Sequence, residues 1–473
     1  MNTQSSSLTQ AHLEQVRAAY DDAPTELNWA ARGYRKLLAH YYNLLIPADA
    51  SVLEIGCGSG DLLSRLNAAR KTGVDLSPHQ IASARLRVPE ADFHIQAGEF
   101  LDLPGTFDYI VVSDTLNLAA DVQQLLARLQ AVSHPNTRLI LNYHSSLWRP
   151  LFVLAGWAGQ RSPRLQSNWL ATADVLNLLQ LADWSAISIQ CRLLLPVPCH
   201  GLEALVNRWL APLLQWFCLT VFVVARPRQK LAGKALSVSV IIPSRNEAGT
   251  VLDAVLRTPE MGAGTELIFV EGHSRDETWA EIQRVQREFP NRKIKIMQQA
   301  GKGKGDAVRM GFAAATGDIL MILDADLTMP PEELPKFYDV LAEGHAEFAN
   351  GVRLVYPMDD EAMQFLNLCA NKTFGIIFTS LLGQPVKDTL CGTKVLSRAH
   401  YERIVANRAY FGDFDPFGDF DLLFGAAKLN LKIADVPIRY RERTYGSTNI
   451  QRWKHGWLLL RMVIFAARKI KFV

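Results

Sequence analysis

Two carboxylates one residue apart, at the end of an apolar run, point most directly to chemistry. Asp324 and Asp326 follow residues 319–323. Side chains alternate along a strand, but at its end the backbone can turn both carboxylates toward one ion. Their hard oxygens favour Mg²⁺ or Mn²⁺, which could bind a diphosphate and neutralise the charge that builds as a bond to phosphate breaks. An acidic turn after a core strand would give the same tripeptide. The choice between a metal site and a structural turn therefore depends on the neighbouring motifs.

A glycine-rich loop follows another apolar run nearer the start of the chain. Gly56, Gly58 and Gly60 come after residues 51–55 and before a helix-like segment. Glycine lets the backbone approach a ligand closely. Asp75 ends the next apolar run, about 20 residues beyond the loop, where a carboxylate can accept both hydroxyls of a ribose. The sequence therefore predicts a nucleoside-binding loop.

Strand-like runs alternate with helix-like segments along the chain, which predicts an α/β fold with two domains. A basic stretch with Pro227 and Gly233 lies between the two halves and is the best linker candidate. We expect a first domain over residues 1–228, a linker over 229–236, a second domain over 237–450 and a last helix over 451–473. Residues 147–225 are rich in Trp, Leu and Pro, and are expected to cap the first domain as a helical lid or an apolar acceptor pocket. The expected strands are residues 51–55, 73–76, 109–113, 138–143, 238–243, 266–270 and 319–323.

Composition narrows the class of protein. The net charge of +3 on 473 residues gives no argument for a nucleic-acid partner. The six cysteines lack the spacing of a zinc site or a redox motif, which predicts reduced thiols in the cytoplasm. Residues 1–15 are too polar for a signal peptide, and the apolar run 209–225 contains Pro212 and is too short to span a bilayer. No transmembrane helix is predicted.

The last segment is basic and amphipathic. From Arg443 to the end there are seven Lys or Arg and no Asp or Glu. Lys454, Arg461 and Arg468 recur every seven residues among apolar side chains, so they form one stripe on a helix. Such a helix could lie on an anionic membrane surface or pack on its own domain. The apolar stretch 373–386 could face the same way, which favours a lipid acceptor and a peripheral location on the cytoplasmic face of the inner membrane.

The first half resembles class I S-adenosylmethionine-dependent methyltransferases, which have a Rossmann-like fold. Their acidic glycine loop is matched over roughly residues 40–145, whereas a dinucleotide-binding loop fits the glycine spacing poorly. The resemblance implies S-adenosylmethionine as cofactor, its ribose on Asp75, and its adenine near the turn that holds Glu99, where the family more often has Gly-Asp. Asp114, Asn117, Tyr143 and His144 follow strand ends and could face a methyl acceptor or merely complete turns. The expected cofactor-binding residues are Glu54, Gly56, Gly58, Gly60, Asp75 and Glu99.

The second half resembles inverting family 2 glycosyltransferases of the GT-A fold, and most closely dolichyl- or polyprenyl-phosphate sugar synthases. The match rests on residues 240–247, 269–278, 301–306 and 315–326. It implies a UDP- or GDP-sugar donor, Mg²⁺ or Mn²⁺ on Asp324 and Asp326, and phosphate contacts from Arg353 and Arg443. The glycine loop 301–306 adds lysines that could meet phosphate. The expected donor-binding residues are Pro243, Arg245, Glu247, Glu271, Lys304, Asp306 and Asp324.

This half departs from the family pattern in three places. Glu271-Gly272 stands where two aspartates are common, and Thr328 stands where the lipid-phosphate subgroup often has glutamine. Residues 451–453 lack the spacing of the processive, polymerising members. We expect a single sugar to be transferred per turnover.

Two acceptor classes remain open. A phosphate monoester is already ionised and needs cations, whereas a hydroxyl needs a general base. Asp415, Asp419 and Asp421 could supply the base or could simply begin a helix. The expected acceptor-phosphate residues are Arg353, Lys394, Arg441 and Arg443.

These expectations combine into one leading hypothesis: a bifunctional enzyme that moves a sugar from a nucleotide to polyprenyl phosphate and carries a methyltransferase of unknown acceptor. The expected catalytic residues are Asp324, Asp326, Asp419, Asp421, Arg353 and Arg443. One alternative is sugar transfer to a hydroxyl of a surface glycan or glycolipid. Another is a non-catalytic methyltransferase-like scaffold fused to an active glycosyltransferase.

Overall fold

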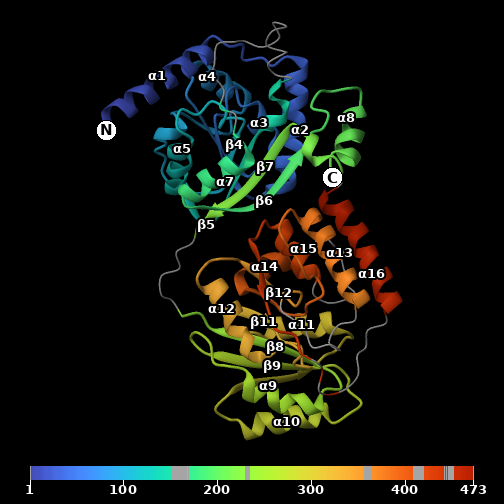
Figure 1. Cartoon of the computed structure of the whole chain (residues 1–473). Coiled ribbons are helices and arrows are strands. Elements are labelled where there is room, and N and C mark those ends of the chain that lie inside the picture. Colours follow the sequence, from blue (N-terminus) through green and yellow to red (C-terminus); the bar gives the residue numbers. More distant parts are fainter. Residues whose placement is uncertain are drawn as a thin grey trace. The chain divides into compact units, whose positions relative to one another are not determined.

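The computed structural model describes residues 2–150, 168, 170–228, 235–355, 365–408, 420–441, 443, 445 and 452–471. The chain divides into two compact units, unit 1 with residues 1–228 and unit 2 with residues 229–471 (Figure 1). Most of the expected linker, residues 229–234, lies outside the described residues.

Unit 1 is built on a seven-stranded sheet in the order β3-β2-β1-β4-β5-β7-β6. Strands β3, β2, β1, β4 and β5 are parallel, and β7 is antiparallel to both of its neighbours. Because parallel strands share one direction, their carboxyl ends meet at one edge, where ligands bind in such sheets. The strands are β1 (Ser51–Ile55), β2 (Arg70–Asp75), β3 (Asp92–Ile95), β4 (Phe107–Ser113), β5 (Ser133–His144), β6 (Trp184–Arg192) and β7 (Thr220–Pro227).

Alternate side chains of the central strands pack into two hydrophobic cores, one on each face of this sheet. Val52 and Val111 pack with α2, α3 and α4, whereas Leu53 and Val112 pack with α5 and α7. Ser77 caps α4 by accepting a hydrogen bond from the Gln80 amide. The helices are α1 (Asn2–Asp21), α2 (Trp29–Leu45), α3 (Asp61–Arg65), α4 (Pro78–Arg87), α5 (Val122–Arg128), α7 (Thr172–Leu181) and α8 (Leu202–Leu205).

Unit 2 contains a second seven-stranded sheet, in the order β10-β9-β8-β11-β13-β12-β14. Strands β10, β9, β8 and β11 are parallel, and β13 is antiparallel to β11 and β12. The carboxyl ends of β8, β9 and β11 therefore lie at one edge. The strands are β8 (Val238–Ser244), β9 (Thr265–Glu271), β10 (Lys293–Gln298), β11 (Ile319–Ile322), β12 (Phe348–Val352), β13 (Lys394–Ser397) and β14 (Ile433–Pro437).

Helices cover both faces of this sheet as well. Val240 and Met321 pack with α9, α10 and α12, whereas Ile241 and Leu320 pack with helices of the opposite face. One face is covered by α9 (Val251–Arg257), α10 (Thr278–Glu288) and α12 (Leu334–Ala342), the other by α11 (Lys304–Ala314), α13 (Phe365–Leu382), α14 (Arg398–Ala406), α15 (Phe420–Lys428) and α16 (Arg452–Ala466).

The expected α/β fold with two domains is confirmed, and each of the seven expected strands is present. The helical cap expected over residues 147–225 differs from the structure. This region supplies α7 and short helical turns, but also β6 and β7, which join the sheet. Strand β7 is buried along its whole length and rich in valine, a composition that favours a central strand over a lid.

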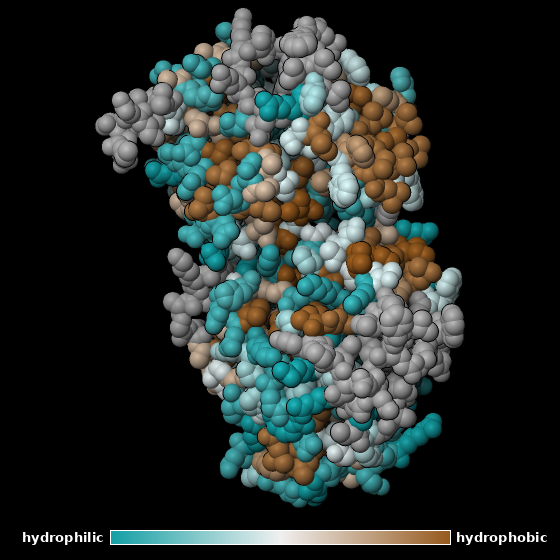
Figure 2. Space-filling view, in the orientation of Figure 1, coloured by the Kyte–Doolittle hydropathy of each residue, from teal (hydrophilic) through white to brown (hydrophobic). Residues whose placement is uncertain are grey.

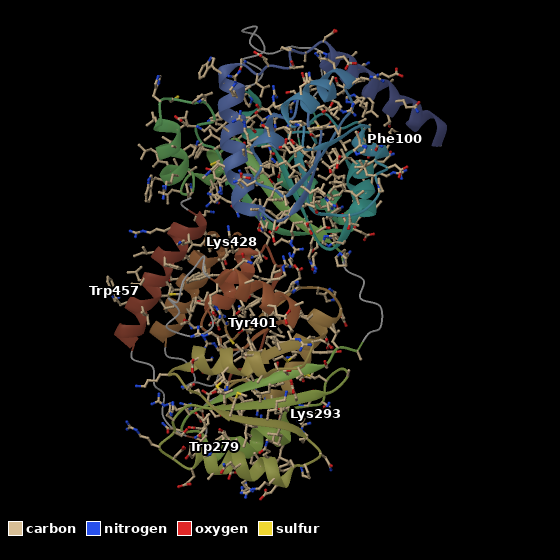
Figure 3. All side chains as sticks on the ribbon, turned by 180° about the vertical axis from the view of Figure 1, so that it is seen from behind. Phe100, Trp279, Lys293, Tyr401, Lys428 and Trp457 are labelled. Carbon is tan, nitrogen blue, oxygen red and sulfur yellow. The ribbon has the colours of Figure 1, made fainter. Side chains whose placement is uncertain are left out.

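Two surfaces expose large apolar side chains. In unit 1 they gather over α8 and the turns that follow it (Figure 2). In unit 2, α16 buries Leu459 and Met462 in the core and exposes Leu460 and Ile464. It also exposes Trp457, which is labelled in Figure 3. The last helix therefore packs on its own unit while leaving an apolar face outside. No described helix combines the length and the hydropathy needed to cross a membrane.

Candidate functional site

The loop after β1 is shaped by glycines with positive φ. A Cβ at Gly56, whose φ is 72°, would lie 2.3 Å from Thr115 Oγ1 just beyond β4. A Cβ at Gly58, whose φ is 52°, would meet no atom within 4 Å. Glycine adopts such φ values without the strain of an L side chain. The loop is therefore tight against β4 at Gly56 and open to a cavity at Gly58.

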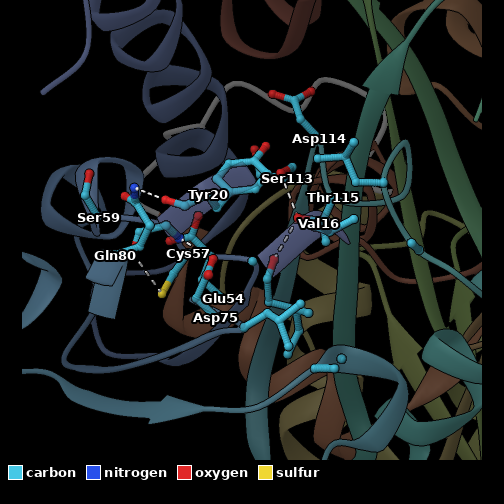
Figure 4. A pocket seen from close by; sticks show the side chains of 18 of the residues that line it. Val16, Tyr20, Glu54, Cys57, Ser59, Asp75, Gln80, Ser113, Asp114 and Thr115 are labelled. Atoms are coloured by element: carbon cyan, nitrogen blue, oxygen red, sulfur yellow. Dashed lines mark hydrogen bonds between the residues drawn. The ribbon is translucent and has the colours of Figure 1, made fainter. Parts of the chain in front are cut away.

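This cavity, of about 310 Å³, lies at the carboxyl ends of β1, β2 and β4. Its walls are the glycine loop, the end of β2, residues 96–99 after β3 and residues 113–115 after β4. Helix α1 closes another side with Leu13, Val16 and Tyr20 (Figure 4). This contribution of α1 was not expected, because its sequence carries no motif.

Asp75 and Glu99 both line the cavity. Each also accepts hydrogen bonds from backbone amides of unit 1. Asp75 accepts hydrogen bonds from the amides of Gly58 (2.8 Å) and Ser77 (2.9 Å). Burial raises the pKa of Asp75, which these bonds oppose. Glu99 is buried and accepts a bond from the Ala120 amide (2.8 Å). Asp75 thus fixes the glycine loop, and Glu99 fixes the turn before α5.

Glu54 is the most unusual ionisable group of this wall. Its burial raises its pKa to about 8, an effect opposed by Arg35 and increased by Asp75. Its Oε2 has no hydrogen-bond partner among the described residues. Together, the acidic wall of Glu54 and Asp75 and the open space over Gly58 suit S-adenosylmethionine, a ligand with cationic groups and hydroxyls.

Asp114 lies apart from Glu54 and Asp75 in the cavity (Figure 4) and anchors a second polar cluster. Its Oδ1 accepts from Asn142 Nδ2 (2.6 Å) and Tyr34 Oη (3.3 Å), and Tyr34 Oη lies 3.4 Å from His144 Nε2. Asn117 Nδ2 lies 3.3 Å from His144 Nδ1. Three of the four strand-end residues considered from the sequence thus come together.

Tyr143, the fourth strand-end residue considered, lies outside this cluster. Its hydroxyl donates to Thr172 Oγ1 (3.0 Å), at the start of α7. Because side chains alternate along β5, Tyr143 faces the opposite side from Asn142 and His144. Arg35, by contrast, lines the cavity and donates to Ser113 Oγ (3.1 Å), although no sequence pattern indicated it.

In unit 2, the ends of the parallel strands β8 and β11 bring carboxylates together. Asp324 and Asp326 follow β11, and Glu247 follows β8. Burial raises the pKa of Asp326, and the charge of Asp324 raises it further. Burial opposes ionisation of Asp324 as well, but the nearby cations Lys304, Lys394 and Arg353 together outweigh burial and lower the pKa of Asp324. The charge of Asp324 therefore acts on Asp326 at this edge of the sheet.

Two cations face these carboxylates. Lys304 Nζ, at the first residue of α11, lies 2.6 Å from Asp324 Oδ1. Arg443 pairs with Glu247 and lies 3.6 Å from Asp326 Oδ2. A Cβ at residue 392 would be 2.0 Å from Asp324 Oδ2, so only glycine leaves room for that carboxylate. Gly392 had not been expected to matter, since its neighbours carry no recognisable motif.

Glu247 adds a third carboxylate to the edge. Burial and the charge of Asp326 raise its pKa to about 7, while Arg443 opposes this. Its Oε2 has no hydrogen-bond partner among the described residues. Hard oxygens of this kind suit Mg²⁺ or Mn²⁺. The described part of the chain contains no group of three or more His, Cys, Asp or Glu side chains arranged as a complete metal site.

The other expected donor-binding residues frame the same edge. Glu271, at the end of β9, accepts from the Ser274 amide and from Gln298 Nε2, and although it is buried its pKa is lowered by these bonds. Asp306 accepts from the Gly301 amide (3.0 Å) and closes the basic loop. Pro243 is half-buried in β8, and Arg245 is exposed. Asp276, which was not among the expected site residues, accepts from Thr278 and Tyr445.

Two of the expected acceptor-phosphate cations are engaged inside the protein. Arg353 forms a two-pronged ion pair with the fully buried Asp388, at 2.7 and 2.9 Å. Lys394 is fully buried and donates to the Cys391 carbonyl. The charges of both cations help to lower the pKa of Asp324. Arg353 and Lys394 therefore stabilise the buried floor beside Asp324.

The other two expected acceptor-phosphate cations lie nearer the surface. Arg441 is exposed, and its amide donates to the Thr328 carbonyl (2.9 Å). This bond ties Arg441 to the turn that follows Asp326. The side chain of Arg443, which faces the same carboxylate, is 23% exposed. Arg441 and Arg443 are thus the members of the expected set that an incoming ligand can reach.

The candidates for a general base are only partly described. Asp421 stands in the first turn of α15, with Arg408 at 3.3 Å and Arg309 at 4.0 Å. Asp415 and Asp419 lie outside the described residues. Asp421 is thus engaged by two cations, as an acidic residue at a helix start often is.

Comparison with known proteins finds one family model that matches part of each unit. Residues 46–175 match a methyltransferase domain, and residues 239–405 match glycosyl transferase family 2. A solved S-adenosylmethionine-dependent methyltransferase from Thermotoga maritima, a possible histamine N-methyltransferase, is 17% identical and has a TM-score of 0.32, covering 41% of this chain and 90% of its own.

Two curated relatives are enzymes that act on lipid phosphates. A dolichol-phosphate mannosyltransferase of Pyrococcus furiosus is 28% identical over 223 residues, which are 46% of this chain and 60% of the relative. An undecaprenyl-phosphate 4-deoxy-4-formamido-L-arabinose transferase of an Enterobacter species is 24% identical over 215 residues, 45% of this chain and 62% of the relative. The match thus spans less than two thirds of either relative. The chain joins a methyltransferase domain to a glycosyl transferase family 2 domain.

Proposed function

We propose that unit 2 transfers one sugar from a UDP- or GDP-sugar to a polyprenyl phosphate, with inversion and with a divalent metal ion, and that unit 1 is an S-adenosylmethionine-dependent methyltransferase. The observation that carries the proposal is the pair Asp324 and Asp326 at one sheet edge, where Lys304 and Arg443 face these carboxylates. Carboxylates for a metal and cations for phosphates are what a nucleotide diphosphate requires.

Asp324 and Asp326 would hold Mg²⁺ or Mn²⁺, which would neutralise the charge of the donor diphosphate. The unpartnered Glu247 Oε2 supports a further cationic ligand at this edge. Lys304 and Arg443 would bind the phosphates, because each already lies against a carboxylate of the site. These residues would stabilise the nucleoside diphosphate as it leaves.

A lipid phosphate as acceptor needs no general base, because its oxygen is already ionised. That oxygen forms a bond to the anomeric carbon of the sugar while the bond from this carbon to the diphosphate breaks. A single displacement of this kind inverts the anomeric centre. Arg441, exposed beside Thr328, and Arg443 are the cations best able to meet the incoming phosphate.

A polyprenyl acceptor agrees with two further observations. The relatives named above act on dolichol phosphate and undecaprenyl phosphate. Helix α16 exposes Trp457, Leu460 and Ile464, and Arg461 lies over the Trp457 ring at 5.8 Å. A Trp-bearing apolar face with a cation suits the headgroup region of a membrane. We therefore propose that unit 2 catalyses this reaction on the cytoplasmic face of the inner membrane.

A hydroxyl acceptor has weaker support. Asp421, the described candidate for its base, is paired with Arg408 and Arg309. A carboxylate that is engaged by two guanidinium groups is less available to an acceptor hydroxyl. The phosphate acceptor is therefore preferred.

In unit 1, the open space over Gly58 and the acidic wall support binding of S-adenosylmethionine. The cofactor would bring a methyl group on a sulfonium. Asp75 and the glycine loop would bind the nucleoside part, and Glu54 would face a cationic part. A non-catalytic scaffold would not require such a cavity to stay open.

The test is to incubate the purified chain with a panel of UDP- and GDP-sugars and polyprenyl phosphate, with and without Mn²⁺, and to analyse the lipids by mass spectrometry. We expect one sugar added to the lipid phosphate in the presence of Mn²⁺. Absence of product with every donor would contradict the proposal for unit 2. Calorimetric titration with S-adenosylmethionine tests unit 1 separately.

A further inference from the structure

Unit 1 carries a dense group of exposed apolar side chains over α8 and the turns after it. Eight of the sixteen residues 202–217 are large apolar residues that are exposed, among them Trp216 at 83% and Leu213 at 71% (Figure 2). We call this group the 202–217 surface; it includes Leu205, Trp209 and Phe217. Scattered exposed apolar residues are normal, but a contiguous group of them marks an interaction site.

The 202–217 surface is held in place by its small and polar residues, while its large apolar ones face outward. Asn207 is buried and exchanges two hydrogen bonds with the Leu195 backbone, at 2.9 and 2.8 Å. Ala211 and Cys218 are buried as well. A segment that stabilises its own core buries its largest apolar side chains, whereas this one exposes them. The outward side chains therefore form a contiguous apolar face among the described residues of unit 1.

The kind of partner follows from the charges and the aromatic residues. Glu203 is the one acidic residue in 195–217, and its carboxylate accepts from the amides of Cys199 (2.7 Å) and Gly201 (3.0 Å). Arg208 is exposed and lies over the Trp209 ring at 5.6 Å. Trp148 Nε1 donates to the Phe217 carbonyl (2.9 Å), and the exposed Arg149 follows Trp148 in the chain.

We propose that the 202–217 surface docks unit 1 on an anionic lipid bilayer, with its tryptophans and leucines in the headgroup region and Arg149 and Arg208 at the lipid phosphates. Tryptophan is enriched at this depth, and arginine stems can lie along apolar surface while the guanidinium reaches phosphate. A protein partner would need matching shape, whereas these short turns with projecting side chains suit a fluid surface. The inference goes beyond the proposed function, because it concerns unit 1 and holds whatever the sugar acceptor is.

The test is flotation of the full chain with vesicles of phosphatidylethanolamine and phosphatidylglycerol, compared with vesicles of phosphatidylcholine alone. The variant Leu213→Ser/Trp216→Ser/Phe217→Ser removes three outward side chains, and Leu86→Ser, a similarly exposed leucine on α4, is its matched control. Each is also made in a Trp457→Ser/Leu460→Ser/Ile464→Ser background, so that binding through α16 is separated. Retained binding of S-adenosylmethionine by calorimetry checks that unit 1 is folded.

We expect the triple variant to lose at least about tenfold in partition to anionic vesicles in both backgrounds, while Leu86→Ser changes nothing. Unchanged partition of the triple variant in both backgrounds would overturn the inference. Self-association without vesicles that is abolished by the triple variant would also overturn it, by identifying a second copy as the partner. Loss of flotation in a protein that transfers no sugar would support the inference and contradict only the proposed function.

Discussion

At the scale of single residues, the donor edge of unit 2 depends on a glycine with no chemistry of its own. A Cβ at residue 392 would lie 2.0 Å from Asp324 Oδ2 and 2.4 Å from Lys304 Nζ. We expect Gly392→Ala to displace the Asp324 carboxylate and to lower sugar transfer by about 100-fold, the effect of misplacing a catalytic group by roughly 1 Å. Steady-state kinetics with the accepted donor measure this.

The matched control for this substitution is Gly272→Ala. A Cβ there would make ordinary contacts of 3.4 Å and longer, and residue 272 belongs to the same edge. Its transfer rate should stay near that of the unaltered chain. Equal rates for the two alanine variants would show that Asp324 does not depend on Gly392.

Glu54 makes a prediction about pH in unit 1. Its pKa is about 8 in the folded chain, mainly because of burial, against an ordinary value of 4.5. Between these pH values the unfolded chain has lost its proton and the folded chain keeps it, so the free energy of unfolding falls as the pH rises. Glu54→Gln has no proton to lose and should gain stability relative to the unaltered chain, on the order of 5 kcal/mol between about pH 4 and pH 9.

Thermal unfolding across this pH range, without cofactor, measures the difference. The melting temperature of the Glu54→Gln variant should exceed that of the unaltered chain increasingly toward alkaline pH. A difference that is constant with pH would mean that Glu54 is ionised in the folded chain.

At the scale of elements, α16 has two faces with different tasks. Met462 is fully buried in the core of unit 2, whereas Ile464 is exposed. Met462→Ala should cost about 2–4 kcal/mol of stability, because it leaves a cavity. Ile464→Ser should change stability by less than about 0.5 kcal/mol. Chemical denaturation of both variants tests this, and an unaffected Met462→Ala would mean that α16 does not stabilise unit 2.

The elements that the sequence predicted are those whose signal is local. The strands of both sheets follow from short apolar runs, and the glycine loop follows from its own spacing. By contrast, the Arg353–Asp388 ion pair joins residues 35 positions apart, and no local pattern joins them. The sequence therefore predicted Arg353 near phosphate and gave no sign of its buried partner.

Contacts between distant segments also explain the other features of the structure that the sequence did not predict. Helix α1 lines the cavity only because the chain folds back over the glycine loop, and β7 joins the sheet only by pairing with β5 and β6. Gly392 matters because of Asp324, which comes from another element. Contacts between distant segments thus separate the predicted site from the observed one.

At the scale of the whole molecule, the two units contain separate cores and separate candidate sites. Gly58→Val should abolish binding of S-adenosylmethionine, because its side chain would enter the cavity at positive φ, and should leave sugar transfer intact. Calorimetry and the transfer assay applied to the same preparation measure both. Loss of sugar transfer in this variant would instead indicate that the two units act together.

Metal-assisted sugar transfer to a lipid phosphate can be tested in a single set of reactions. The unaltered chain and Asp326→Asn are each given the accepted nucleotide-sugar with polyprenyl phosphate or with polyprenol, with Mn²⁺ or with a chelator, and the lipids are quantified by mass spectrometry. We expect glycosylated polyprenyl phosphate from the unaltered chain with Mn²⁺. We expect no glycosylated product from polyprenol, in the presence of chelator, or from Asp326→Asn. Equal product from Asp326→Asn, or sugar on the hydroxyl of polyprenol, would contradict this expectation.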